Sequence, residues 1–164
     1  VIEGTGILMN NEMDDFSAAP GVPNQFNLLG AEANEIAPFK RPLSSMTPTI
    51  VLKNDELFFT TGSPGGARII SAVLQSILNI IDFNMNLEDT TLAKRIHHQW
   101  YPDILEYEFS LDKIIENDLK KIGYKTSSKL PLTSLQTIMF ADGIYYGYGD
   151  FRRVDALASG EIYD

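Results

Sequence analysis

The stretch from residue 50 to residue 81 constrains the fold most, because it specifies three elements in succession. Two apolar runs, at residues 50–52 and 57–60, flank the polar sequence KNDE, and this pattern predicts a β-hairpin. From residue 69 onward, apolar residues recur at helical spacing and predict an amphipathic helix whose apolar stripe packs on a sheet. The stripe consists of Ile69, Ile70, Val73, Leu74, Ile77, Leu78 and Ile81.

Residues 60–68, with the sequence TTGSPGGAR, connect this hairpin to this helix. Three glycines and a proline at such a position describe a tight turn that presents backbone N–H groups at the N-terminus of a helix. That arrangement binds anions. Glycine and proline also punctuate ordinary turns, and taken alone the pattern favours a plain strand-to-helix connection.

The rest of the chain predicts further short strands and helices. The expected elements are a buried strand at residues 7–9, a helix at 87–94 with Asn86 as its N-cap, a strand at 104–108, a helix at 111–122 closed by Gly123, and a second hairpin at 136–148. Because hairpins join antiparallel strands, we expect a layered α+β fold rather than repeated βαβ units. A length of 164 residues fits a single domain, residues 1–164.

Two clusters of polar residues are candidates for binding charged groups. Glu12, Asp14 and Asp15 place three carboxylates within four residues, and carboxylates this close favour a bound cation such as an ammonium group. A solvated acidic turn is the alternative. Ser44 and Ser45 lie between two prolines, where their hydroxyl groups could donate hydrogen bonds to an anion; taken alone they favour a simple turn.

Residues 18–41 contain four glycine or proline breaks before Pro38 and no helical or strand period, while apolar residues argue against a solvated linker. We therefore expect an ordered lid.

His97 and His98 are adjacent, so in a strand they point to opposite faces and cannot share a metal ion. We expect them to serve packing and hydrogen bonding, and we expect neither a metal nor another cofactor.

Composition excludes several classes of function. The formal net charge of −9 repels nucleic acid and anionic membrane surfaces, and the basic pairs Lys120-Lys121 and Arg152-Arg153 are too small to reverse that repulsion. The longest apolar stretch, residues 69–83, is interrupted by polar residues and predicts no membrane span. The absence of cysteine excludes disulfides, thiolate metal sites and a cysteine nucleophile.

Five motifs, taken together and in order, resemble the small catalytic subunit of the gamma-glutamyltranspeptidase (glutathione hydrolase) family. They are NNEMDDFS at 10–17, PGVPN at 20–24, KRPLSSMTPT at 40–49, TGSPGGARII at 61–70 and RIHHQW at 95–100. The resemblance implies an N-terminal-nucleophile hydrolase fold, a four-layer αββα sandwich that a large and a small subunit of one precursor build jointly. It also implies an N-terminal threonine nucleophile freed by self-cleavage, whose α-amine acts as the base. This threonine attacks γ-glutamyl amides such as glutathione, and the acyl group passes to water or to an amino-acid or peptide acceptor.

The resemblance assigns roles to individual residues. Glu12 and Asp15 hold the α-ammonium of the glutamyl donor, and Glu12 stands where some members have glutamine. Ser44 and Ser45 bind its α-carboxylate, together with an arginine of the large subunit. The N–H groups of Gly65 and Gly66 form the oxyanion hole, and residues 20–31 form the lid. Phe26 takes the place of the gating tyrosine of some bacterial relatives, and it cannot donate the hydroxyl hydrogen bond.

One departure concerns the nucleophile. The family's Thr-Thr-His start is expected before Val1, and Val1 offers no hydroxyl group, so we expect this stretch to require an upstream segment for acyl transfer. A truncated, non-catalytic protein that binds a partner or a glutamyl ligand is the main alternative. A sibling acylase acting on other amides is another, and Asp15 with Ser44 and Ser45 argues against it. The family resemblance implies a periplasmic or extracellular location.

Overall fold

The computed structural model describes residues 1–131 and 133–161. They form two compact units, Val1–Ser45 and Met46–Asp164, each of which is described here by itself. The sequence predicts a single domain over residues 1–164. That range includes residue 132 and residues 162–164, which lie outside the described residues. The single domain therefore stays a prediction.

The first unit consists mostly of loops held by local hydrogen bonds. It contains two short 3-10 helices, η1 (Glu12–Asp15) and η2 (Glu32–Asn34). Isolated bridges pair Ser17 with Glu35 and Pro23 with Leu29. The predicted buried strand at residues 7–9 is wrong: these residues are exposed and belong to no strand, because no neighbouring segment of the described chain pairs with them.

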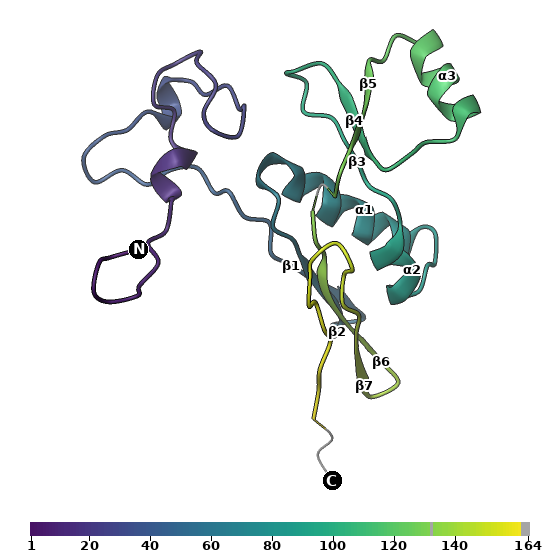
Figure 1. The fold of residues 1–164 in the computed structure, drawn as a ribbon. Coiled ribbons are helices and arrows are strands. Elements are labelled where there is room, and N and C mark those ends of the chain that lie inside the picture. Colours follow the sequence, from purple (N-terminus) through teal and green to yellow (C-terminus); the bar gives the residue numbers. More distant parts are fainter. Residues whose placement is uncertain (132, 162–164) are drawn as a thin grey trace. The chain divides into compact units, whose positions relative to one another are not determined.

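A four-stranded antiparallel sheet forms the base of the second unit (Figure 1). Its order is β1 (Thr49–Lys53), β2 (Glu56–Gly62), β6 (Gln136–Ala141) and β7 (Ile144–Gly147). Both predicted hairpins are confirmed. Two-residue turns close them at Asn54-Asp55 and Asp142-Gly143, and all four turn residues have φ between 52° and 76°. Such turns match the right-handed twist of the paired strands.

Helix α1 (Ile69–Ile81) follows β2 through the short helix η3 (Gly66–Arg68) and contacts both β2 and β3. The helix is confirmed, but its predicted inward stripe is only partly right. Its buried residues are Ile69, Ala72, Val73, Ser76 and Ile80. By contrast, Ile70 and Leu74 are 65% and 52% exposed. The helix is apolar around most of its circumference, so spacing alone could not select the inward face.

Buried hydroxyl groups join α1 to the sheet. Thr61 Oγ1 lies 3.3 Å from Ser76 Oγ and 2.8 Å from Thr137 Oγ1, which links α1, β2 and β6. Ser76 Oγ also donates to the carbonyl oxygen of Val73 at 2.8 Å. Each of these three buried hydroxyls therefore has a partner, which offsets the cost of removing it from water.

The second sheet has the order β3 (Ile96–His97), β4 (Leu105–Glu108) and β5 (Thr126–Lys129), and it lies on the other side of α1 from the first sheet in Figure 1. Strands β3 and β4 are antiparallel, whereas β4 and β5 are parallel. Helix α3 (Lys113–Lys121) connects the parallel pair, so this part is one βαβ unit that the hairpin-based prediction missed. Helix α2 (Leu87–Leu92) begins at the predicted cap, where the Asn86 side chain accepts from the Asp89 N–H at 2.7 Å.

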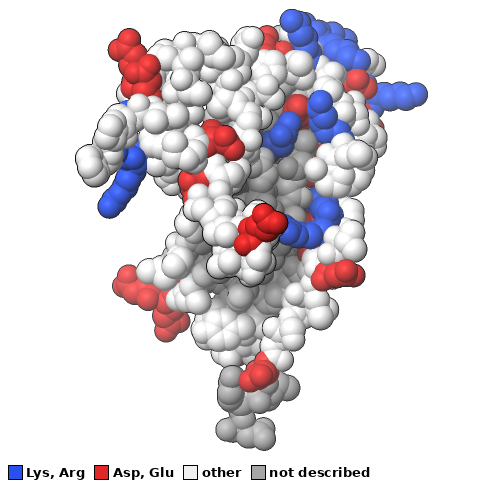
Figure 2. Space-filling model, turned by 60° about the vertical axis from the view of Figure 1, so that its left-hand side comes forward, with Lys and Arg blue, Asp and Glu red and all other residues white. Residues whose placement is uncertain are grey.

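The elements confirm the predicted α+β class. Within the described part of the chain, no helix is long and apolar enough to cross a membrane. On the face drawn in Figure 2, acidic side chains are spread widely, and Lys and Arg side chains gather toward the upper right. The basic pair on α3 is partly neutralised, because Lys120 and Lys121 form ion pairs of 2.7 Å with Glu116 and Asp118.

Candidate active site

The glycine turn has the strand-to-helix setting that the sequence predicts. Gly65 adopts φ 144° and ψ 14°, and Gly66 adopts φ 58°, backbone conformations that residues with a side chain rarely adopt. Among the described residues, neither glycine N–H donates a hydrogen bond. The Gly65 carbonyl instead accepts from the Arg68 N–H at 3.2 Å, which opens η3. Two adjacent free N–H groups at a helix start can stabilise a negative oxygen.

Two side chains anchor this turn to other segments of the chain. Ser63 is buried; its hydroxyl lies 3.1 Å from the Ser134 carbonyl oxygen and 2.8 Å from that of Pro64, and it accepts from the Ser134 N–H at 3.3 Å. At the other end of the turn, Arg68 donates to the Glu106 carboxylate on β4 through Nε at 2.8 Å, and its Nη2 lies 2.7 Å from the same oxygen. The turn is therefore held on both sides, which favours a fixed position for its N–H groups.

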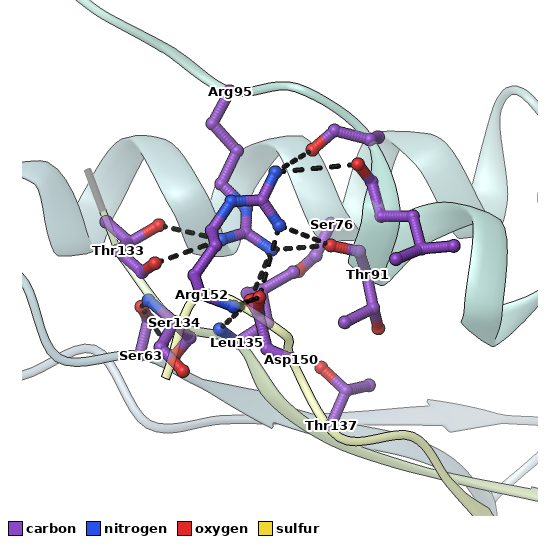
Figure 3. Close-up of polar contacts among 12 residues, drawn as sticks. Ser63, Ser76, Thr91, Arg95, Thr133, Ser134, Leu135, Thr137, Asp150 and Arg152 are labelled. Atoms are coloured by element: carbon purple, nitrogen blue, oxygen red, sulfur yellow. Dashed lines mark hydrogen bonds and ion pairs between the residues drawn. The ribbon is translucent and has the colours of Figure 1, made fainter. Parts of the chain in front are cut away.

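A buried cluster of four charged residues, Arg95, Glu108, Asp150 and Arg152, lies beyond Ser134. Figure 3 shows three of them, Arg95, Asp150 and Arg152. Arg95 Nη2 pairs with Asp150 Oδ2 at 2.8 Å, and Arg152 Nη2 pairs with Glu108 Oε2 at 2.6 Å. The side chains of Arg152, Glu108 and Asp150 are fully buried. Neutral oxygens complete the cluster: Arg95 donates to Thr91 and Thr133, and Arg152 donates to the carbonyl oxygens of Thr91 and Ala93.

The cluster shifts the pKa of two of its members. Burial lowers the pKa of Arg95, with the neighbouring positive charge of Arg152 as the next cause. Burial alone would raise the pKa of Asp150, but N–H donors from Arg152 and Leu135 and the Arg95 guanidinium outweigh burial and lower it. The same Asp150 carboxylate accepts from the Leu135 N–H at 2.8 Å. A continuous set of contacts thus runs from the cluster through residues 133–135 to Ser63 and the glycine turn.

No sequence pattern predicts this cluster. Its members lie between 2 and 57 residues apart along the chain, and no local period or motif connects them. From the sequence, Arg152 is only one half of the basic pair Arg152-Arg153. In the structure its side chain is buried and paired with carboxylates.

Residues 12–15, the acidic segment of the first unit, form the 3-10 helix η1. The acidic turn considered as an alternative is therefore a single turn of 3-10 helix. Glu12 and Asp14 are exposed and Asp15 is half-buried. Two asparagine side chains bind backbone carbonyl oxygens of this segment. Asn24 donates to the Asp14 carbonyl oxygen at 3.3 Å, and Asn34 donates to the Asp15 carbonyl oxygen at 2.7 Å. The carboxylates are thereby left on a fixed backbone.

Ser44 and Ser45 lie in an exposed extended segment at the end of the same unit. The residue before them, Leu43, donates its N–H to the Asn34 side-chain oxygen at 3.0 Å. One side chain therefore connects the acidic segment to the serine segment. The structure brings the two predicted halves of the donor site into one unit.

The predicted lid is an ordered loop. The Asn24 side chain accepts from the N–H groups of Phe26 at 2.9 Å and Leu28 at 3.1 Å, and the Leu28 carbonyl accepts from the Asn24 N–H at 3.0 Å. Phe26 is half-buried at the tip of this turn. The role of the loop as a lid stays a prediction. The glycine turn belongs to the second unit, so its place relative to the lid and the donor site is likewise left as a prediction.

The two histidines make the predicted hydrogen bonds. His97 is buried, with Nδ1 2.8 Å from Ser71 Oγ and Nε2 2.9 Å from Gln99 Oε1. His98 Nε2 lies 3.0 Å from Asp103 Oδ1, and its Nδ1 accepts from the Trp100 N–H at 3.2 Å. Within residues 1–131 and 133–161, no three His, Asp or Glu side chains gather in a way that could hold a metal ion.

Comparison with known proteins identifies the family and the fold. The family model described as gamma-glutamyltranspeptidase matches residues 1–160. The glutathione hydrolase proenzyme of Escherichia coli is 50% identical over 157 residues, which are 95% of this chain and 27% of that protein. A crystal structure of a mutant Helicobacter pylori gamma-glutamyltranspeptidase has a TM-score of 0.89 and 47% identity, covering 93% of this chain and 85% of that one. The gamma-glutamyltranspeptidase of Pseudomonas nitroreducens has a TM-score of 0.89 and 36% identity, covering 100% and 86%.

These similarities identify the fold and the family of the chain. The fold is the α+β fold of the N-terminal-nucleophile hydrolases, as the motifs implied. The chain belongs to the gamma-glutamyltranspeptidase family. It spans about a quarter of the length of the curated relatives that it matches.

Proposed function

We propose that this chain provides the donor-binding site and the oxyanion hole of an enzyme that hydrolyses glutathione and other γ-glutamyl amides and transfers their γ-glutamyl group. The observation that carries the proposal is the pair of N–H groups at Gly65 and Gly66 at the start of a helix, for which no acceptor lies among residues 1–131 and 133–161. Membership of the gamma-glutamyltranspeptidase family supports the choice of reaction.

In the proposed reaction, a threonine hydroxyl on another segment of the protein attacks the γ-carbonyl carbon of the donor. Its proton passes to the threonine α-amine, and the carbonyl oxygen becomes an oxyanion that accepts from Gly65 and Gly66. The C–N bond then breaks, the leaving amine takes the proton, and a glutamyl ester remains on the threonine. Water or the amine of an acceptor attacks that ester and frees the threonine. Each oxyanion donor is worth roughly 3 to 4 kcal/mol in such reactions.

Recognition of the donor falls to the first unit in this proposal. The carboxylates of Asp15 and Glu12 bind the α-ammonium, and the hydroxyls of Ser44 and Ser45 bind the α-carboxylate. Support comes from the hydrogen bonds that connect the two segments through Asn34. Carboxylates that attract an ammonium group, together with hydroxyls that donate to a carboxylate, would select an α-amino acid over a plain acyl group.

The remaining parts of the proposal concern the whole protein. We propose a large subunit, cut from the same precursor, as the partner of this chain. The share of the relatives' length that the chain spans and the word proenzyme in their names support this. A periplasmic or extracellular location is proposed from the family resemblance alone.

The direct test uses the complete processed protein and a γ-glutamyl anilide. We expect release of the free aniline, and faster release when a dipeptide acceptor is added. Absence of release above background would refute the enzymatic proposal. Binding of L-glutamate without any release would instead support the alternative of a non-catalytic glutamyl-binding protein.

A further inference from the structure

We propose that Asn34 is a positioning residue for the donor site, acting through Asp15 on one side and through the Ser44-Ser45 segment on the other. The inference rests on the proposed function, since it deepens the account of that same site. Asn34 has no assigned role in the sequence motifs, because it lies between the lid motif and the serine motif.

The first step of the argument is the use of both halves of the Asn34 amide. The Nδ2 group donates to the Asp15 carbonyl oxygen at 2.7 Å, and Oδ1 accepts from the Leu43 N–H at 3.0 Å. An amide is the side chain that offers a donor and an acceptor a short distance apart. The two bonds reach 19 residues back and 9 residues forward along the chain.

The second step is that the Asn34 backbone is itself fixed. Its carbonyl oxygen accepts from the Ser17 N–H at 2.9 Å, and its N–H donates to the Ala31 carbonyl oxygen at 2.9 Å. Ser17 and Glu35 form an isolated parallel bridge at the same place. The side chain is half-buried and starts from a held backbone, so it has little freedom to follow the segments that it connects.

The third step concerns which residues receive the two bonds. One bond ends on Asp15 itself, and the other ends on the residue directly before Ser44. A ligand with an ammonium group and a carboxylate on one carbon needs both partners at a fixed separation. Asn34 sets that separation through its bonds to the backbone of the two segments, so it acts on the ligand through them.

The test replaces Asn34 by Ala in the complete processed protein. We expect the KM for a γ-glutamyl anilide and the Kd for L-glutamate to rise about tenfold, as for the loss of a hydrogen bond, with kcat little changed. Partial misfolding would give a different result, because a smaller active fraction lowers the apparent kcat and leaves KM unchanged. That result, or an unchanged KM, would overturn the inference.

A second variant, Asn34→Asp, keeps the shape and the acceptor for Leu43 but loses the donor for Asp15. Its added negative charge attracts the donor's ammonium and repels the donor's α-carboxylate, two effects of opposite sign, and we expect the lost bond to Asp15 to raise KM. An unchanged or lowered KM would contradict the role proposed for that bond. The matched control is Asn117→Ala on the exposed surface of α3, for which we expect KM and Kd to stay unchanged.

Calorimetric binding of L-glutamate to the unsubstituted protein separates the two proposals. Binding without turnover refutes the catalytic proposal, and the Kd of the Asn34 variants still tests the inference. No binding refutes both. Turnover with Asn34 variants that keep the original KM and Kd refutes the inference alone.

Discussion

At the scale of single residues, Gly65 is the position where the backbone conformation excludes a side chain. Its φ of 144° lies where residues with a Cβ atom are strained, so Ala must shift the turn and redirect the N–H groups. We expect Gly65→Ala to lower kcat for γ-glutamyl anilide hydrolysis by about a hundredfold or more, with a small change in KM. Steady-state kinetics of the complete processed protein would measure both constants.

Gly62→Ala is the matched control for this change. An added Cβ at Gly62 meets nothing within 4 Å, and its φ is outside the left-handed region. We expect kcat close to that of the unsubstituted protein. Equal losses at the two glycines would mean that the turn tolerates no change at all and would remove the argument for an oxyanion hole.

Asp15 and its neighbour Asp14 provide a second comparison between similar residues. We expect Asp15→Asn to raise the KM for glutamyl donors by roughly ten- to a hundredfold, because a hydrogen bond to a charged group is lost. Asp14→Asn should leave KM unchanged, since Asp14 is exposed and has no assigned contact with the donor. An unchanged KM for Asp15→Asn would contradict the role that we propose for this carboxylate.

At the scale of elements, the buried charges connect β4, the segment after α2, and the loop after β7. Removal of one partner takes away the opposite charge that compensates most of the burial cost of the other. We expect Arg152→Ala to lower the free energy of unfolding by about 3 to 5 kcal/mol, because Glu108 then loses its guanidinium partner. Denaturant unfolding of the complete protein would measure the change.

Arg153→Ala is the control for this prediction, because the adjacent arginine is exposed. We expect it to change the free energy of unfolding by less than about 0.5 kcal/mol. Similar losses for both arginines would show that net charge, rather than the buried pair, determines the effect.

Sequence patterns predicted the elements that have strong local signals. The hairpins and α1 were found because apolar alternation, polar turns and helical spacing all lie within a few residues of each other. Strand β5 was missed because its sequence TSSK has no apolar run, and only its parallel pairing with β4 makes it a strand. The prediction for residues 7–9 was wrong for the opposite reason. These residues form an apolar run, but an apolar run without a neighbouring strand to pair with does not become a strand.

The candidate site was predictable to a similar degree. Glycine, acidic and hydroxyl residues carry their chemistry in short motifs, so residues 12–15, 44–45 and 65–66 could be selected from the sequence. Asn34 and the buried ion cluster could not, because their contacts join segments far apart in the chain and their residue types are ordinary for loops. Supporting residues of this kind become visible only when the backbone is folded.

At the scale of the whole molecule, one side of α1 in the second unit carries exposed apolar side chains. Ile70, Leu74, Leu78 and Ile81 lie along one side of the helix and are all exposed. A contiguous apolar surface of this kind marks an interaction site. We expect it to contact the proposed large subunit, and Ile70→Gln combined with Leu74→Gln to weaken the association of the two processed subunits, measured by gel filtration.

Leu130→Gln serves as the control, because Leu130 is 82% exposed and lies outside α1. We expect subunits with this change to remain associated. Unaltered association of the α1 variant would contradict the assignment of this face to the interface.

The buried ion cluster also has a consequence for the order in which the protein is synthesised. Arg95 and Glu108 leave the ribosome well before Asp150 and Arg152, the residues that neutralise them in the core. Until Asp150 and Arg152 emerge, closing the core would enclose Arg95 and Glu108 without their ion-pair partners, which is costly. The second unit therefore completes its core only after Asp150 and Arg152 have been synthesised, and a product that ends before Asp150 lacks the ion-pair partners of two buried residues.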